Sequence, residues 1–295
     1  MSPEPAETRE TEPFNIIYEL CQERGLTLSL ENLATLIPSI SYENLKDHHV
    51  GKQNGIEPLF LVDGGGILID NRFRALPPEA QKYGLSHELG HLIDSYLRQF
   101  RPDLAGRLTT VIESLTPEMV SRYADHINKQ ENNNKSKISG EMTAELIAQY
   151  MNSDGTFLGM VNARLLQERR WAEESGQSSA EEAQDEAEIA MISQFLSGEN
   201  PDISELAERF PSFANYFRAY QELNSILLNP ETFMPLNDLL TEGFVFDDYL
   251  VDYDEMLSGY EPEIAPVRAP KSSVPEKSLF AQLFDFSAVF GGKSE

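Results

Sequence analysis

The strongest constraint on the fold of this chain is one long segment that lies between two proline sites, Pro77-Pro78 and Pro102. Between them, large apolar residues recur at helical spacing and define one broad face: Leu85, Leu89, Leu92, Ile93, Tyr96 and Leu97. A helix with such a face gains stability by burying it against other elements. The segment is therefore predicted to form a long amphipathic helix that packs on a core.

Shorter elements are predicted on both sides of this helix. Two apolar runs, 59–62 and 67–69, flank Asp63 and Gly64–Gly66, a pattern typical of a β-hairpin. The other predicted elements are an apolar run at 36–40, a polar loop at 131–137, and helices at 14–25 (ended by Gly25), 103–115, 116–130, 140–151, 157–171, 179–196 and 203–228. The expected class is α+β, with a small sheet packed on the long helix and a mainly helical region after it.

The long helix carries the sequence Ser86-His87-Glu88-Leu89-Gly90-His91. Residues four apart share a helix face, so His87 and His91 can bind one zinc ion. Glu88 lies one position around the helix and can reach a water molecule instead of the metal, as a general base must. In a chain with five histidines, a chance match to this motif has a probability of roughly 1 in 100. The alternative is a pair of exposed histidines on an ordinary surface helix.

A hydrolytic zinc site usually has three protein ligands and one open position. The histidine-based extension of this motif is missing, because Leu97 occupies the position of the third histidine. Glutamate is the better candidate: Glu141 and Glu145 are four apart on a predicted helix, and Glu141 follows His91 by fifty residues. One carboxylate can bind the metal while the other orients a ligand histidine.

Two stretches, S-H-E-L-G-H-L-I-D (86–94) and G-E-M-T-A-E-L-I-A-Q-Y (140–150), resemble the catalytic-domain family of anthrax lethal factor. Members of that family are zincins, metalloproteases built around the H-E-x-x-H helix, and their third metal ligand is a glutamate. The resemblance covers about residues 55–155, roughly a third of the chain. It implies a zincin-like fold for this part of the molecule.

The resemblance also implies a role for individual residues. One zinc ion would have three protein ligands, namely His87, His91 and Glu141. Glu88 would act as the general base, and Glu145 and Asp94 would support the ligands from behind.

The family further has a tyrosine shortly before the glutamate helix, where it stabilises the oxyanion of the reaction. This chain has only polar residues in its 131–137 loop, and Tyr123 is the nearest upstream substitute, with His126 as another. A tyrosine on a helix can equally be a packed residue with a solvated hydroxyl. Tyr150 is a poorer candidate, because nine positions after Glu141 it falls on the far side of the helix.

The predicted activity is zinc-dependent hydrolysis of peptide bonds in a specific protein substrate. Zincins commonly hold a substrate as an additional strand along a sheet edge, and Gly66–Asn71 is the candidate edge in this chain. An ordinary hairpin strand is the alternative for that segment. The competing class of function is a non-catalytic, acidic protein-interaction module whose metal site is structural or vestigial.

Charge and composition limit the partners and the compartment. The 295 residues include 49 acidic and 23 basic ones, and this net charge of −26 disfavours nucleic acid and anionic membranes. It is compatible with a basic protein partner, and solvated surface is the simpler interpretation of the acidic segments. No apolar run reaches the length of a membrane span.

Cys21 is the single cysteine, and the first residues lack the features of a Sec signal. The expected setting is the cytoplasm, or a host cell entered without a Sec signal, as by a translocated bacterial effector. The sequence leaves the oligomeric state undetermined.

Composition also predicts the limits of the domains. Residues 1–13 are expected to form a disordered tail. The zincin-like metalloprotease domain is expected at 14–230, with its core at about 55–155 and a helical extension after it. Residues 231–257 are expected to form an acidic aromatic segment, and 258–295 a proline-containing linker and C-terminal tail. The acidic residues are concentrated late in the chain, since 151–295 holds 27 acidic and 9 basic residues. Two segments without a basic residue, 173–188 and 242–263, contribute seven and eight of these acids.

Overall fold

A computed structural model describes residues 11–45, 60–63, 66–130, 135–175 and 211–234, together with the single positions 190, 194, 195, 208 and 236. Several sequence-based expectations fall outside these residues. They concern the tail before residue 11, most of the helix at 179–196, the acidic segment at 242–263 and the C-terminal tail.

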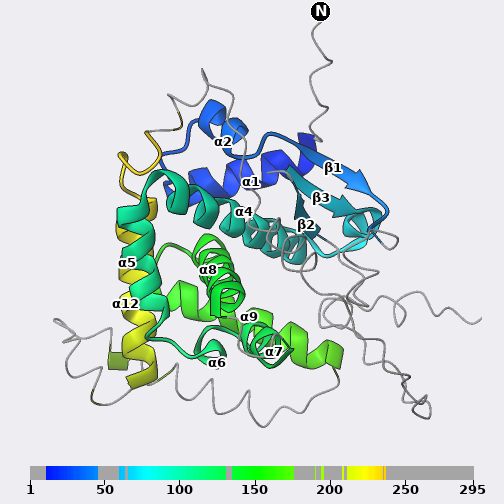
Figure 1. The fold of residues 1–295 in the computed structure, drawn as a ribbon. Coiled ribbons are helices and arrows are strands. Elements are labelled where there is room, and N and C mark those ends of the chain that lie inside the picture. Colours follow the sequence, from blue (N-terminus) through cyan, green and yellow to red (C-terminus); the bar gives the residue numbers. More distant parts are fainter. Residues whose placement is uncertain are drawn as a thin grey trace, which may run out of the picture.

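The described residues form an α+β fold, as the sequence predicts (Figure 1). In chain order the elements are α1 (Thr11–Arg24), α2 (Leu30–Leu36), β1 (Ile40–Glu43), β2 (Phe60–Asp63), β3 (Gly66–Asp70), a 3-10 turn (Asn71–Ala75), α4 (Pro78–Phe100), α5 (Pro102–Ile112), α6 (Pro117–Val120), α7 (Arg122–Gln130), α8 (Lys135–Met151), α9 (Phe157–Ser175) and α12 (Pro211–Leu227). Among the described helices, none is both long and apolar enough to cross a bilayer.

Within the described residues, the sheet has three strands in the order β1-β3-β2. β2 and β3 pair antiparallel, with Asp63 opposite Gly66, which confirms the predicted hairpin. β1 pairs parallel with β3 on its other side. The prediction that Gly66–Asn71 forms the sheet edge is therefore wrong. β3 is the central strand, because the parallel partner β1 arrives from an earlier part of the chain, and Asn71 belongs to the 3-10 turn.

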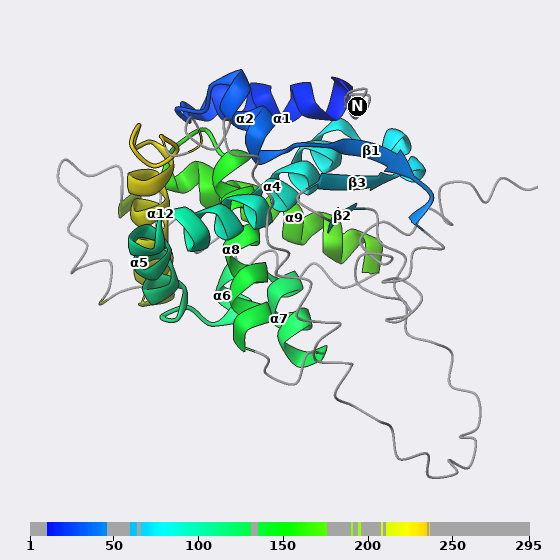
Figure 2. The same cartoon turned by 45° about the horizontal axis from the view of Figure 1, so that its top comes forward.

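The long helix predicted between the prolines is α4, and it runs through the middle of the molecule. Figures 1 and 2 show the sheet and α1 on one side of it and α8 on the other. The helix is enclosed more completely than one apolar face requires, since all six residues from Leu85 to Gly90 are buried. Two histidine-motif residues, His87 and Glu88, are thus packed inside the fold and not presented on a surface helix.

Several helix boundaries differ from the sequence-based expectation, since α5 ends at Ile112 and α9 ends at Ser175. α1 begins at Thr11, three residues early, because Pro13 falls in the first turn, where proline is tolerated. α8 begins at Lys135, so positions 135–137 of the predicted polar loop are helical. The single helix expected at 116–130 is two helices, α6 and α7, separated at Ser121, whose backbone is extended with φ −168° and ψ 159°.

The last described residues return to α4. α12 lies beside α5 (Figure 1), and the chain after it places Phe233 against Tyr96 of α4, with stacked rings 5.7 Å apart. The Tyr96 hydroxyl donates a hydrogen bond to the carbonyl of Thr232 at 2.8 Å. Leu236 is also fully buried. The packed body of the protein therefore continues past residue 230.

Candidate metal centre

Two histidines on α4 face each other across one turn of the helix. His87 and His91 are four residues apart, and their Nε2 atoms lie 3.2 Å from each other. Their rings meet edge to face, with centroids 4.9 Å apart. The helix therefore directs both nitrogens toward one point.

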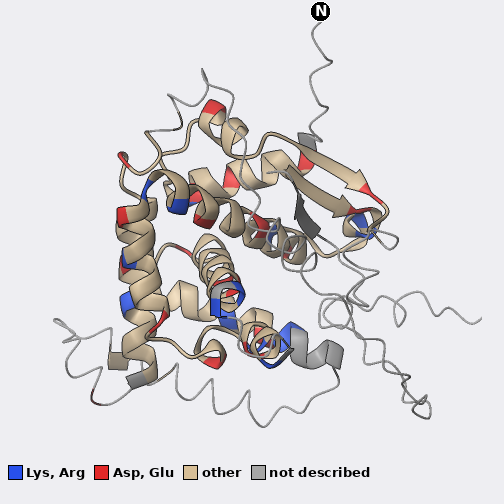
Figure 3. Ribbon diagram, in the orientation of Figure 1, with Lys and Arg blue, Asp and Glu red and all other residues tan. Residues whose placement is uncertain are grey.

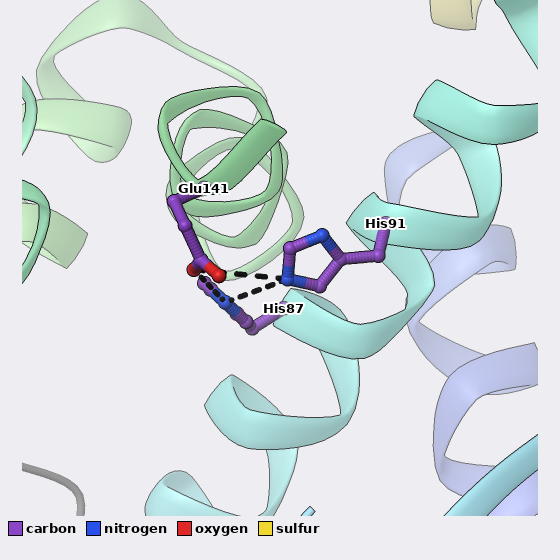
Figure 4. Close-up of side chains that lie close together, drawn as sticks. All are labelled: His87, His91 and Glu141. Atoms are coloured by element: carbon purple, nitrogen blue, oxygen red, sulfur yellow. Dashed lines mark hydrogen bonds and ion pairs between the residues drawn. The ribbon is translucent and has the colours of Figure 1, made fainter. Parts of the chain in front are cut away.

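The third group of the site comes from α8, which crosses α4 (Figure 4). Glu141 Oε2 lies 3.4 Å from His87 Nε2 and 3.8 Å from His91 Nε2. The ligand atoms of the three residues all lie within 4.8 Å of one another. The side chain of His87 is buried, whereas those of His91 and Glu141 keep 28% and 16% of their surface exposed. One side of this cluster therefore reaches solvent.

The spacing of these atoms suits a tetrahedral ion. Ligand bonds of about 2.0–2.1 Å place the donor atoms of a tetrahedron about 3.3–3.4 Å apart, and the three observed separations are 3.2, 3.4 and 3.8 Å. Glu141 Oε2 is buried, and the polar atoms that it faces are the Nε2 atoms of the two histidines. His87, His91 and Glu141 could therefore bind a metal ion.

A close helix crossing brings the three groups together. A Cβ atom added at Gly90 would lie 2.7 Å from Ala144 Cα and 2.8 Å from the Ala144 carbonyl oxygen, closer than real Cβ atoms approach backbone. Gly90 therefore lets the backbones of α4 and α8 touch, and Ala144 adds little bulk on the other side. Both small residues lie inside the two motifs, between His87 and His91 on one helix and between Glu141 and Glu145 on the other.

Glu145 holds His87 from the side away from Glu141. His87 Nδ1 lies 3.2 Å from Glu145 Oε2, and because a carboxylate oxygen accepts, the Nδ1–H donates this hydrogen bond while Nε2 faces the metal position. The Tyr83 hydroxyl donates to Glu145 Oε1 at 2.5 Å, and Gln149 Nε2 donates to the same oxygen at 3.3 Å. The carboxylate is therefore fixed by three partners and sets the tautomer and orientation of His87.

Glu88 lies between the two histidines in sequence but is not one of the three residues whose ligand atoms cluster. Its side chain is buried. Burial raises the pKa of Glu88 to about 7, with the Glu141 carboxylate adding to the rise and the charge of His87 opposing it. A carboxyl group with this pKa can both accept and return a proton near neutral pH.

Tyr123 lies beside the cluster, on α7. Its ring meets the ring of His87 edge to face, with centroids 5.6 Å apart. Burial raises the pKa of the Tyr123 hydroxyl well above its ordinary value, and the carboxylates of Glu141, Glu88 and Glu145 raise it further. The hydroxyl therefore keeps its proton and can act as a hydrogen-bond donor at the site.

Of the remaining candidate residues, Asp94 and Tyr150 form hydrogen bonds with residues outside the ligand cluster, and His126 lies near Tyr123 in the sequence. Asp94 Oδ2 accepts a hydrogen bond from Arg98 Nε at 2.9 Å, one turn further along α4. The Tyr150 hydroxyl donates to Asn224 Oδ1 of α12 at 3.0 Å, in agreement with its predicted place on the far side of α8. His126 is partly buried on α7, three residues after Tyr123.

The ligand residues have opposite pKa shifts. Burial lowers the pKa of His91 to about 4. Burial also disfavours a charge on His87, but the carboxylates of Glu141 and Glu145 outweigh it and raise the pKa of His87 to about 10. Burial would raise the pKa of Glu141, but His91 and His87 lower it to about 2. Without a metal, the site therefore holds a proton on His87 between two carboxylates.

Sequence reasoning missed three residues that shape this centre: Tyr83, Gly90 in its packing role, and Gln149. Tyr83 was open to detection, because it precedes His87 by four residues and so shares its helix face. Gln149 follows Glu145 by the same interval. The closeness of Gly90 to Ala144 has no local signal, because it depends on how two helices cross.

No protein-family model, curated protein or solved structure matches the chain.

Proposed function

We propose that this protein is a zinc-dependent endopeptidase that hydrolyses a specific protein substrate. The observation that carries the proposal is the arrangement of four side chains. Three of them, His87, His91 and Glu141, bring their ligand atoms to one point, while the buried Glu88 stands apart with a pKa near 7. A purely structural metal site does not need a proton-accepting group beside its ligands.

The donor set favours zinc. Two imidazole nitrogens and one carboxylate oxygen at tetrahedral spacing are the ligands of zinc hydrolases, which leave a fourth position for water or substrate. Calcium and magnesium prefer sites built from oxygen atoms. The partial exposure of His91 and Glu141 supports an open fourth position on the solvent side. A zinc ion bound there would polarise the substrate carbonyl and make water more acidic.

The chain's own residues would supply the proton transfers and the binding of charge. Glu88 would take a proton from the attacking water and return it to the leaving amine. Tyr123, with its proton retained, would donate a hydrogen bond to the oxygen that becomes negative. Glu145 would keep His87 in the required tautomer throughout.

The substrate would bind along β2 as an added strand. β2 is an edge of the described sheet, pairs only with β3 among the described strands, and contacts α4, the helix that carries the histidines. An extended peptide can satisfy the free backbone groups of such an edge. A basic substrate would suit the net charge of −26. The resemblance to the lethal-factor family supports a host protein as substrate of a translocated effector.

The test compares wild-type protein with Glu88→Ala and with Glu113→Ala, which changes an exposed glutamate at the end of α5. Each purified protein is loaded with zinc and incubated with a cell lysate, and new peptide N-termini are identified by mass spectrometry. We expect one or a few cleavage sites with wild type and Glu113→Ala and none with Glu88→Ala, while all three bind one zinc ion per chain.

Two results would overturn the proposal. The first is purified wild-type protein that binds no stoichiometric zinc. The second is a Glu88→Ala variant that produces the same new N-termini as wild type. Zinc binding in wild type without any cleavage would instead favour the non-catalytic interaction module.

A further inference from the structure

Gln149 continues a line of functional side chains along α8. Glu141, Glu145 and Gln149 are spaced by four residues and so lie on one face of the helix. The first belongs to the ligand cluster and the second holds His87. Gln149 is fully buried, which is unusual for a polar side chain and requires partners for its amide.

Both the nitrogen and the oxygen of the Gln149 side-chain amide form hydrogen bonds. Nε2 donates to the Val120 carbonyl at 2.8 Å and to Glu145 Oε1 at 3.3 Å. Oε1 accepts a hydrogen bond from the Tyr216 hydroxyl of α12. Only a primary amide offers two donors and an acceptor in this shape, because a carboxylate has no donor and an apolar side chain has neither.

Val120 is significant because it ends α6, directly before the extended Ser121 at which the chain turns into α7. Tyr123 follows three residues later. The junction between α6 and α7 also contacts α9, where Glu168 Oε1 accepts a hydrogen bond from the Arg122 backbone N–H at 2.8 Å. The position of Tyr123 beside His87 therefore depends on hydrogen bonds from α8 and α9 to the α6–α7 junction.

We propose that Gln149 is a positioning residue that fixes two parts of the site relative to each other. Through Glu145 it sets the orientation of the ligand His87, and through Val120 it sets the place of Tyr123. The Tyr216 hydroxyl donates to the amide oxygen and takes no part in either of these two links. The role assigned to Tyr123 rests on the proposed peptidase function, whereas the two structural links do not.

The test uses full-length protein and three variants. Gln149→Met removes all three hydrogen bonds with little change in volume. Gln149→Glu keeps the shape and loses both donors. Tyr216→Phe is the matched control, because it loosens the same buried network but leaves both Gln149 donors in place. Zinc affinity is measured with Zn²⁺ alone in competition with a chelator. The environment of Tyr123 is measured by ¹⁹F NMR of 3-fluorotyrosine protein, with its resonance assigned by Tyr123→Phe.

We expect both Gln149 variants to bind zinc several-fold more weakly, a smaller loss than the roughly 10–100-fold typical of removing the residue that contacts a ligand histidine directly. Their Tyr123 resonance should also shift. Tyr216→Phe should lie nearer wild type in both measurements. If Gln149→Met does not fold by circular dichroism, Gln149→Glu carries the test.

The inference is wrong if both Gln149 variants match wild type in zinc affinity or in the Tyr123 resonance. It is also wrong if Tyr216→Phe changes both measurements as much as they do, since general loosening of the core would then explain the effect. A wild-type protein that binds no zinc would overturn this inference together with the proposed function. Wild-type zinc binding with unchanged Gln149 variants would overturn this inference alone.

Discussion

Glu141 and Glu145 are identical side chains one helical turn apart, and their surroundings give them different tasks. Glu141 Oε2 faces the Nε2 atoms of both histidines, at 3.4 and 3.8 Å. Both oxygens of Glu145 are occupied, by His87 on one side and by Tyr83 and Gln149 on the other. The sequence offered the pair as alternatives, and the contacts distinguish them.

Glu141→Ala should therefore weaken zinc binding much more than Glu145→Ala. Loss of Glu141 removes one of three donor atoms, whereas loss of Glu145 removes a partner of His87 and should cost about 10–100-fold in affinity. Zinc affinity of the purified variants, measured by chelator competition, checks the order. A greater loss in Glu145→Ala would exchange the two roles.

At the scale of elements, the site exists because α4 and α8 cross in contact at Gly90 and Ala144. The ligand histidines and their carboxylates lie on either side of this crossing, so the separation of the helices sets the distances between ligand atoms. A change in helix separation of a few tenths of an ångström would matter directly, because metal–ligand bonds tolerate deviations of only about 0.2 Å.

Gly90→Ala should destabilise the fold and weaken zinc binding together. The added Cβ would lie 2.7 Å from Ala144 Cα, so the helices must move apart at a cost of about 1–3 kcal/mol. Gly106→Ala on α5 is the matched control, because a Cβ there meets no atom within 4 Å. That variant should gain about 0.5–1 kcal/mol from better helix propensity. Denaturant unfolding and zinc affinity measure both effects, and equal behaviour of the two variants would contradict the close-crossing argument.

The division between α6 and α7 shows why some boundaries escape sequence analysis. Residues 116–130 have a good start signal at Thr116 and a pattern that favours one helix. The break at Ser121 is instead stabilised from outside the segment, by Gln149 at Val120 and by Glu168 at Arg122. A local pattern cannot contain information about partners that lie far along the chain.

At the scale of the whole molecule, charge and chemistry occupy different parts of the chain. Residues 66–130, which include α4 and α7, hold eight acidic and eight basic residues, and Figure 3 shows both signs interspersed over these elements. The acidic excess of the protein lies mostly after residue 150. Most of the negative charge is therefore separated along the sequence from the segments that supply the ligands of the centre.

Zinc should stabilise the whole fold, and by more at high pH. The ligands join α4 to α8, so zinc binds the folded protein better than the unfolded chain and raises its unfolding temperature. In the metal-free protein the pKa of His87 is raised to about 10, so at neutral pH a proton occupies the site and zinc must displace it. That proton stabilises the metal-free fold at low pH, and its contribution is lost as pH rises toward 10. Zinc affinity should thus increase about tenfold per pH unit in this range.

Thermal unfolding with and without zinc at pH 6 and pH 8 measures this effect. The zinc-dependent rise in unfolding temperature should be larger at pH 8, and His91→Ala should abolish most of it at both pH values. An equal rise at both pH values would show that His87 carries no proton in the metal-free protein.

The sequence by itself determined the features that depend on nearby residues. Spacing alone placed His87, Glu88 and His91 on one helix, paired the hairpin strands around Gly64–Gly66, and ended α1 at Gly25, whose φ is 72°. Tertiary structure alone decided the parallel pairing of β1, the central place of β3, the approach of Tyr123 to His87, and the division of tasks between Glu141 and Glu145. The physical reason is the range of the forces involved. Helix periodicity and turn geometry act within a few residues, whereas the ligand distances and buried hydrogen bonds arise where helices from distant parts of the chain come into contact.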